Sequence, residues 1–315
     1  MTTLMSLNGV TKQFGTRNKR VVAVDNVDLA VETGETLGIV GESGCGKSTL
    51  ARLALRLIEP SDGRIEFDGR DITPLDQHQL RGLRSEIQIV FQDPNASLNP
   101  RWTVGRIVGE PLVAQRRSSA DVRERVAQML ALVGLPADAV NRHPASFSGG
   151  QRQRIGIARA LAPAPRLLVC DEAVSALDAS VQAQILNLLK DLQTELNLTL
   201  LFISHNLAVI RHLSQRVAVM YLGRIVEIAD EAAFFGEPLH PYSVMLIAAV
   251  PEPGLRPRYL GVSAEPADGA RRPPGCHFHP RCPIARARCS TDDPDLLPAS
   301  NGHLVRCHYP GELVL

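Results

Sequence analysis

The stretch from Gly41 to Ser48 reads Gly-Glu-Ser-Gly-Cys-Gly-Lys-Ser. It fits the pattern of glycine, four residues, glycine, lysine and serine or threonine, which cradles phosphate groups when it joins a buried strand to a helix. Backbone N–H groups of such a loop point at the β- and γ-phosphates, and the positive end of the following helix adds to the attraction. Lys47 would neutralise charge and Ser48 would hold Mg²⁺. The loop residues expected at the nucleotide are Gly41, Glu42, Ser43, Gly44, Cys45, Gly46, Lys47, Ser48 and Thr49.

Two acids and a histidine follow apolar runs further along the chain. Asp171 and Glu172 come after the run 166–170, and His205 ends the run 198–204. The carboxyl edge of a parallel sheet is where ligands of such folds bind. We expect Asp171 to reach Mg²⁺ through water and Glu172 to orient or deprotonate an attacking water, because phosphoryl transfer depends on positioning and charge stabilisation. His205 is expected to contact the γ-phosphate. A capping role for the two acids is the alternative.

A second set of anion-seeking groups lies at Ser148, Gly149, Gly150 and Gln151, at the start of a basic segment. A helix that begins near Gly150 offers unpaired N–H groups and a positive dipole end, both of which attract an anion. One chain with one phosphate loop has no obvious use for this second grip. A plain glycine-rich helix cap is the alternative.

The elements that must position these groups are of two kinds. The runs 36–40, 166–170 and 198–204 are continuously apolar, which is typical of strands buried on both faces of a parallel sheet. Residues 21–31 instead alternate, and the pair Asp68-Gly69 suits a tight hairpin, so the chain is expected to begin with antiparallel strands. These patterns predict an α/β fold.

A mostly helical block is expected to interrupt the sheet at about residues 93 to 164. Within it, apolar residues recur at helical spacing, with Ser118 as a start signal and Gly134 as a stop. After about residue 235 the composition shifts to Pro, Gly and Arg, as in residues 251–275, which predicts a linker and a loop-rich appendage. We therefore expect a first domain at residues 1–235 and an appendage at residues 236–315.

Composition excludes several classes of protein. The chain has 315 residues, of which 44% are apolar and 21% charged, as expected of a folded chain with two modest domains or one domain and an appendage. The net charge of +1 gives no long-range field toward a polyanion, so nucleic acid is not an expected partner. No secretory leader and no run of about 18 apolar residues is found, so the cytosol is the expected compartment.

The order of motifs resembles the ATP-binding cassette family, the nucleotide-driven subunits of ABC transporters, over about residues 5 to 235. This resemblance implies a P-loop ATPase core with a RecA-like, mostly parallel sheet, an antiparallel β subdomain and a helical insertion. It also implies two subunits packed head to tail, in which the Ser148-Gly149-Gly150 signature of each closes the nucleotide site of the other. The second grip would then serve a paralogous or identical ATPase subunit.

Other positions match the family one at a time. Gln92 matches the glutamine that links Mg²⁺ and the attacking water to the transmembrane partner, and residues 175–178, ending in Asp178, match the loop that crosses the dimer interface. Phe14 falls where an aromatic ring stacks on adenine, with a role in the core or hairpin as the alternative. Phe147 and Ala173 replace a common leucine and a common proline, and neither change removes a group that does chemistry.

Five segments resemble the ATPases of oligopeptide and dipeptide importers, particularly the second of their two paralogous subunits. They are residues 91–101, 171–189, 204–210, 220–227 and 240–251, the last beginning with His240-Pro241-Tyr242. The resemblance implies an ATP-hydrolysing motor at the cytoplasmic face of the inner membrane, docked beneath two permease subunits. An extracytoplasmic peptide-binding protein would deliver the peptide to these subunits. Nickel and glutathione importers belong to the same branch, so the cargo stays open.

Two other classes of protein are alternatives to a transporter subunit. A soluble ABC ATPase that acts on nucleic acid or ribosomes would normally carry two cassettes or a basic arm, and the sequence has neither. A catalytically silent cassette would be expected to lack the base or the signature, whereas Glu172 and Ser148 are present.

Four of the six cysteines lie in the appendage: Cys276, Cys282, Cys289 and Cys307. Four thiols in a segment too small to bury much core suggest a metal staple. Their spacing is not that of paired zinc modules, and the resemblance implies a 4Fe-4S cluster. Zinc with help from His277, His279 or His308, and thiols without metal, are the alternatives. Cys45 is expected to face out of the phosphate loop and Cys170 to lie in a buried strand, both as small apolar fillers.

Overall fold

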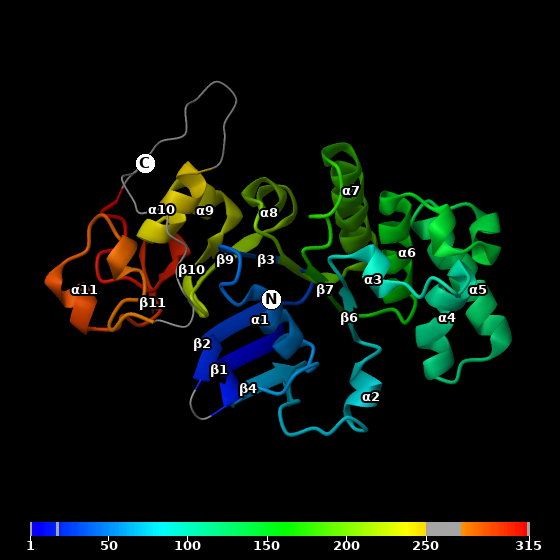
Figure 1. Cartoon of the computed structure of the whole chain (residues 1–315), viewed down its shortest axis with the longest axis horizontal. Coiled ribbons are helices and arrows are strands. Elements are labelled where there is room, and N and C mark those ends of the chain that lie inside the picture. Colours follow the sequence, from blue (N-terminus) through cyan, green and yellow to red (C-terminus); the bar gives the residue numbers. More distant parts are fainter. Residues whose placement is uncertain (1, 17–18, 250–271, 314–315) are drawn as a thin grey trace. The chain divides into compact units, whose positions relative to one another are not determined.

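A computed structural model of the chain describes residues 2–16, 19–249 and 272–313 (Figure 1). The chain divides into two units, the first made of residues 1–73 and 202–315 and the second of residues 74–201. The boundary that the sequence places at residue 235 falls inside the first unit and stays a prediction. Most of the predicted linker lies outside the described residues.

The first unit contains most of the strands. Its elements are β1 (Thr3–Thr16), β2 (Lys19–Glu32), β3 (Thr36–Val40), α1 (Lys47–Ala54), β4 (Asp62–Phe67), β5 (Arg70–Asp71), α8 (Leu207–Leu213), β9 (Arg216–Tyr221), β10 (Arg224–Asp230), α9 (Glu231–Gly236), α10 (Pro241–Ala248), α11 (Ala287–Thr291), β11 (Leu297–Pro298) and β12 (Leu304–Val305). The strand β8 (Thr199–Ile203) crosses from the second unit into the first.

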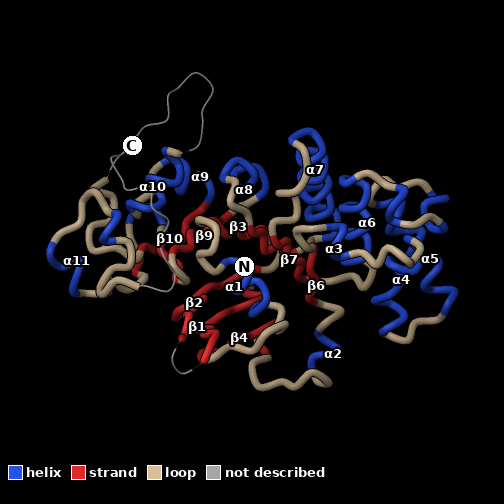
Figure 2. The backbone as a smooth tube through the Cα atoms, in the orientation of Figure 1, coloured by secondary structure: helices blue, strands red, loops and turns tan. Residues whose placement is uncertain are grey.

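The antiparallel sheet predicted for the N-terminal part is present, with the strand order β2-β1-β4-β5. Leu7 on β1 pairs with Leu29 on one side and with Ile65 on the other, and all three are buried. The predicted hairpin is confirmed, because Asp68 and Gly69 have φ of 51° and 73°, the left-handed pair that a type I′ turn needs. Figure 2 shows these strands beside α1, which contacts β1 and β2.

The second sheet of the first unit has the order β11-β12-β10-β9-β3, with β3 and β9 parallel. All five residues of β3 are buried, as the continuous apolar run 36–40 predicts, and α8 packs against this strand. The appendage adds strands that the sequence did not predict: β12 runs antiparallel to β10 with Glu227 opposite Val305. The appendage is therefore built onto the sheet that carries the phosphate loop.

The second unit consists of α2 (Leu80–Leu83), β6 (Ile87–Val90), α3 (Pro94–Ser97), α4 (Val104–Ala114), α5 (Ser119–Leu132), α6 (Gly149–Leu161), β7 (Leu167–Asp171), α7 (Ala179–Leu196) and the start of β8. The helices α4, α5 and α6 contact one another, so the predicted helical block is confirmed. The start of α5 is also as predicted, since the Ser118 side chain accepts the Asp121 N–H and Gly134 has a φ of 70°.

The two parallel strands of the second unit are β6 and β7, with Val90 opposite Cys170. The predicted run 166–170 is shifted by one residue, because Asp171 itself belongs to β7. Thr199 at the start of β8 donates to the Arg166 carbonyl within this unit, and Ser204 just after β8 donates to the Ile39 carbonyl within the other, each at 3.1 Å. Within the described residues, no helix is long and apolar enough to cross a membrane.

Candidate nucleotide site and the appendage beside it

The phosphate loop leads from β3 into α1, as the pattern requires. Two of its glycines are needed for space and for backbone conformation. Gly41 has a φ of 155°, and a Cβ there would lie 2.1 Å from the Met220 carbonyl oxygen. Gly46 has a φ of 111°, and a Cβ there would lie 2.2 Å from the Ala23 carbonyl oxygen. The loop is thus pressed against two neighbouring strands, which fixes the direction of its N–H groups.

Lys47 is the first residue of α1 and only 5% exposed. Its Nζ donates hydrogen bonds of 2.8 Å to the carbonyl oxygens of both Gly41 and Glu42. The ammonium group is therefore held across the loop, where it can meet a phosphate oxygen. Ser48 and Thr49 follow on the first turn of α1 and are half-buried, while Ser43 and Gly44 are exposed.

The expectation that Cys45 faces out of the loop is wrong. Its side chain is buried, with its Sγ 3.8 Å from Lys47 Nζ, because the loop folds back over it. A Cβ on Gly41 would lie 2.8 Å from this sulfur. Burial raises the pKa of the Cys45 thiol, which suits a small apolar filler beneath the loop. Cys170 is buried in β7, as predicted.

Two further predicted residues belong to the first unit. His205 is exposed just after β8, at the end of its strand as predicted. Phe14 is 44% exposed on β1, and Lys12 Nζ lies 5.2 Å from the centre of its ring. An exposed ring beside a cation can stack on a flat base. The contacts of both residues with a nucleotide stay predictions.

The second unit brings Glu172 and Gln92 together. Gln92 Nε2 donates to Glu172 Oε2 at 3.0 Å, so the amide orients the carboxylate predicted to be the general base. Glu172 has a φ of 50°, and a non-glycine residue in this region costs about 1–3 kcal/mol, as is common at functional sites. The preceding Asp171 is 9% exposed at the end of β7.

The signature forms the start of α6. The Ser148 side chain accepts the Gln151 N–H, and the Gln151 side chain accepts the Ser148 N–H in return. A Cβ on Gly150 would lie 2.3 Å from Val181 Cγ1 on α7, whereas one on Gly149 would come no closer than 3.6 Å to Leu177. Gly150 thus serves packing between two helices, and Gly149 leaves the helix end open. The first N–H groups of a helix have no partner within it.

Asp178 ends the loop predicted to cross a dimer interface. It is the N-cap of α7, and its carboxylate accepts the Val181 N–H at 3.0 Å and the Ser180 hydroxyl at 2.9 Å. The hydrogen bond from the Val181 N–H, and to a smaller extent that from the Ser180 hydroxyl, lower the pKa of Asp178. The residue keeps a negative charge at the base of the loop.

The segment His240-Pro241-Tyr242 has a structural role that the sequence does not reveal. It starts α10, with His240 Nδ1 accepting the Tyr242 N–H at 3.0 Å. The Tyr242 hydroxyl accepts the backbone N–H of Glu42, in the phosphate loop, at 2.9 Å. Arg281 from the appendage forms two hydrogen bonds to the Glu42 carboxylate, of 2.8 and 2.9 Å. The residues joined are 200 and 239 positions apart, so no local pattern could have predicted these contacts.

A buried glutamate anchors this segment. Glu227 on β10 is 0% exposed and accepts the N–H groups of Leu239 at 2.8 Å and His240 at 3.0 Å. His303 of the appendage lies with its Nδ1 2.7 Å from the same carboxylate. Burial opposes ionisation, but the hydrogen bonds from His303 and the two N–H groups outweigh it and hold the pKa of Glu227 below its usual value.

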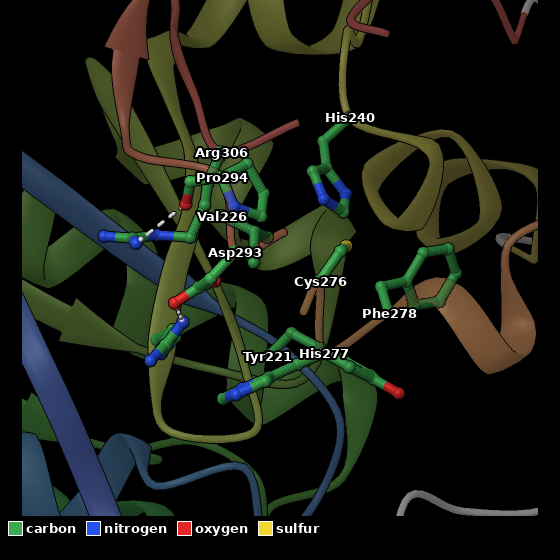
Figure 3. Close-up of a pocket in the computed structure, with 10 residues that line it drawn as sticks. Tyr221, Val226, His240, Cys276, His277, Phe278, Asp293, Pro294 and Arg306 are labelled. Atoms are coloured by element: carbon green, nitrogen blue, oxygen red, sulfur yellow. Dashed lines mark hydrogen bonds and ion pairs between the residues drawn. The ribbon is translucent and has the colours of Figure 1, made fainter. Parts of the chain in front are cut away.

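The four cysteines of the appendage line one cavity, together with Phe278, His279, Ile284 and His308. Burial raises the pKa of Cys276, that of Cys282 to about 11 and that of Cys307 to about 12. Among the described residues, no group of three or more His, Cys, Asp or Glu side chains is arranged to hold a metal ion. Cys276 also lines the neighbouring pocket in Figure 3, with Phe278, Tyr221 and His240.

Two family models match the chain. One, described as ABC transporter, covers residues 24–175, and the other, described as the C-terminal region of oligopeptide/dipeptide transporters, covers residues 226–289. The chain is 52% identical to a probable peptide ABC transporter ATP-binding protein, y4tS, of Sinorhizobium fredii, over 94% of this chain and 84% of that protein. It is 46% identical to the oligopeptide transport ATP-binding protein AppF of Bacillus subtilis, over 97% of each. For OppF of Salmonella typhimurium the identity is 48%, over 92% of this chain and 88% of that protein.

Solved structures agree on the fold. A dimeric, post-hydrolysis ATP-binding cassette, MJ0796 bound to ADP and Pi, matches with a TM-score of 0.66 and 32% identity, covering 72% of this chain and 99% of that chain. CbiO1 from Clostridium perfringens, described as part of the ABC transporter complex cbiONQ, matches with a TM-score of 0.68 and 27% identity over 75% of this chain and 92% of that chain.

Proposed function

The chain belongs to the ABC transporter family of ATP-binding subunits, and from this premise we propose that it is the ATP-hydrolysing motor of an importer for oligopeptides or dipeptides. The reaction is the hydrolysis of ATP to ADP and phosphate. The observation that carries the proposal is the start of α6, where Ser148 caps a helix end that is otherwise open. The same chain already has one complete phosphate loop. Two such grips are useful when two chains share each nucleotide.

The first unit supplies the groups that bind the triphosphate. We assign Lys47 and the loop N–H groups between Gly41 and Gly46, apart from the Glu42 N–H that donates to Tyr242, to the β- and γ-phosphates. Phe14 is assigned to adenine and His205 to the γ-phosphate. A glycine-lined loop pressed against its neighbours needs little rearrangement when phosphate arrives. Such preorganisation is what charge stabilisation in phosphoryl transfer requires.

The second unit supplies the groups that act on water. We assign Glu172 as the base that takes a proton from the attacking water, with Gln92 holding its carboxylate in place at 3.0 Å. Asp171 and Gln92, like Ser48 of the first unit, have the oxygen ligands that Mg²⁺ prefers, and a bound Mg²⁺ would neutralise phosphate charge. Asp178 and the start of α6, including Gln151, would face the nucleotide of a second ATPase subunit.

The appendage points to the peptide-importing branch, because the family model of residues 226–289 is that of oligopeptide/dipeptide transporters. We infer docking at the cytoplasmic face of the membrane onto two permease subunits, fed by an extracytoplasmic binding protein. ATPase assays on the complex extracted from membranes would separate cargoes. Stimulation by peptides, and none by Ni²⁺ or glutathione, is expected; stimulation by Ni²⁺ or glutathione alone would reassign the cargo.

We also propose that the four appendage cysteines hold a 4Fe-4S cluster. Support comes from their placement around one cavity and from the number of thiols, which is the ligand set of such clusters. A single Zn²⁺, which needs its ligands to converge on one point, is the alternative. When bound, the cluster would cross-link the appendage and supply a one-electron redox centre. Protein purified without oxygen should be brown and contain about four irons and four sulfides per chain; colourless protein, with or without zinc, would count against it.

The decisive experiment for the motor is Glu172→Gln. Binding of MgATP should be retained and turnover lost by at least about 100-fold, within the usual contribution of a general base. Light scattering should then show an ATP-dependent dimer. Glu195→Gln, at an exposed position of α7, is the matched control and should turn over like the wild type. Turnover near the wild-type rate in Glu172→Gln would remove Glu172 from the mechanism.

A further inference from the structure

Two side chains from beyond residue 235 hold Glu42 within the phosphate loop. The Tyr242 hydroxyl accepts the Glu42 N–H at 2.9 Å. The guanidinium of Arg281 donates to both oxygens of the Glu42 carboxylate, at 2.8 and 2.9 Å. A paired, planar contact of this kind fixes direction as well as distance. Backbone and side chain of one loop residue are therefore both held by the appendage side of the unit.

The two holding residues are themselves rigidly placed. Tyr242 is fully buried, and its ring lies 4.6 Å from that of Tyr221 and 5.5 Å from that of Phe278. Arg281 is 12% exposed and lies over the rings of Tyr221 and Phe278. Figure 3 shows Tyr221 and Phe278 at the pocket next to this contact. Burial raises the pKa of Tyr242, and the pair with Glu42 raises that of Arg281, so the hydroxyl stays protonated and the guanidinium charged.

The negative charge of Glu42 explains why a contact with Arg281 would matter for nucleotide binding. A carboxylate on a loop that receives a polyphosphate repels its ligand, and the Glu42 side chain is 34% exposed. Lys47, the cation of the loop, binds the carbonyl oxygens of Gly41 and Glu42 and leaves the carboxylate to Arg281. Arg281 therefore neutralises an acid at the entrance of the phosphate site while it holds the loop in shape.

We propose that Arg281 and Tyr242 are positioning residues for the nucleotide, through which the appendage sets the affinity of the phosphate loop for MgATP. The proposal rests on the proposed function, because it takes ATP as the ligand of this loop. It adds a dependence on residues outside the loop and outside every motif of the cassette. Tyr242 fixes the backbone of Glu42, and Arg281 cancels its charge.

The test measures the dissociation constant of MgATP by calorimetry on the full chain. Arg281→Met should weaken binding about tenfold, the effect of one unpaired charge about 10 Å from a phosphate at an effective dielectric constant of about 20. Glu42→Gln leaves the Arg281 charge unpaired beside the phosphates and should, by the same estimate, strengthen binding by up to about tenfold. The double variant should return to within about threefold of the wild type, because it contains no unpaired charge. Tyr242→Phe tests the backbone contact and should weaken binding about threefold to tenfold, as expected of one neutral hydrogen bond.

The control is Arg288→Met, which removes an arginine of α11 whose pair with Asp292 is exposed. It should bind MgATP like the wild type. Recovery in the double variant separates charge neutralisation from a merely structural role, under which the second substitution would not restore affinity. Unchanged binding in Arg281→Met, or no recovery in the double variant, would overturn the inference alone. Failure of the wild type to bind MgATP would overturn the proposed function as well.

Discussion

Replacing Glu227 by glutamine should loosen the whole anchor of the appendage. The two oxygens of this carboxylate serve different donors: Oε1 accepts the Leu239 N–H and faces His303 Nδ1, while Oε2 accepts the His240 N–H. A glutamine keeps only one oxygen. If that oxygen takes the place of Oε1, the new NH₂ group faces the His240 N–H, donor against donor, in a site that is 0% exposed.

The size of the effect follows from these contacts. A buried donor left without an acceptor costs about 1–3 kcal/mol, and the remaining hydrogen bonds lose the strengthening that a charged acceptor gives. The sum is about 3 kcal/mol, which corresponds to about a 100-fold rise in the opening equilibrium of the segment that holds Leu239 and His240. This is a large part of the 5–15 kcal/mol that stabilises a typical domain.

Hydrogen exchange followed by mass spectrometry on peptides that cover residues 237–248 measures this opening directly. Protection should fall about 100-fold in Glu227→Gln. Glu231→Gln is the matched control, since Glu231 forms a 3.8 Å ion pair with the exposed Arg211, and such pairs contribute about 0–1 kcal/mol. Protection within about twofold of the wild type in Glu227→Gln would refute the claim that this carboxylate anchors the segment.

Two more predictions concern packing and acid. Gly150→Ala should destabilise the chain by about 1–2 kcal/mol in urea unfolding, because the clash of the new methyl group with Val181 costs more than the gain in helix propensity. Gly149→Ala should leave stability unchanged yet lower ATP turnover. Equal unfolding midpoints for the two variants would contradict this difference. Since the pKa of Glu227 in the folded state lies below 4.5, its contribution to stability is present above that pH. This contribution is lost as the pH falls through the pKa of the folded state. Protection of residues 237–248 should therefore decline only below about pH 4.5, and Glu227→Gln should remove this step.

Sequence patterns were sufficient where the physical cause is local. The strand at 36–40 is an uninterrupted apolar run, the turn at Asp68-Gly69 needs two left-handed residues, and the helix after Ser118 has its own cap. The phosphate loop belongs to this class too, because its glycines are adjacent to the lysine that they help to place. Each of these features is specified by residues within a few positions of one another.

Sequence patterns failed where the cause is a contact between distant side chains. The pairing of Arg281 with Glu42 joins residues 239 positions apart, and neither periodicity nor spacing encodes it. The same holds for Glu227 and His303, 76 positions apart. The burial of Cys45 has a related cause: it depends on the loop closing over this side chain, which the neighbouring strands impose.

The ordering of the appendage is thermodynamically coupled to the conformation of the phosphate loop, because the appendage has little core of its own. Its described part buries few apolar side chains, namely Leu239, Tyr242, Val244, Phe278, Cys289 and Val305. Its order must therefore come from contacts with the rest of the unit and from whatever the thiol cavity holds. Arg281 directly precedes Cys282, so a ligand that orders the cavity also places the guanidinium that holds Glu42. By linkage the effect is reciprocal: nucleotide that tightens the loop must tighten the appendage by the same free energy.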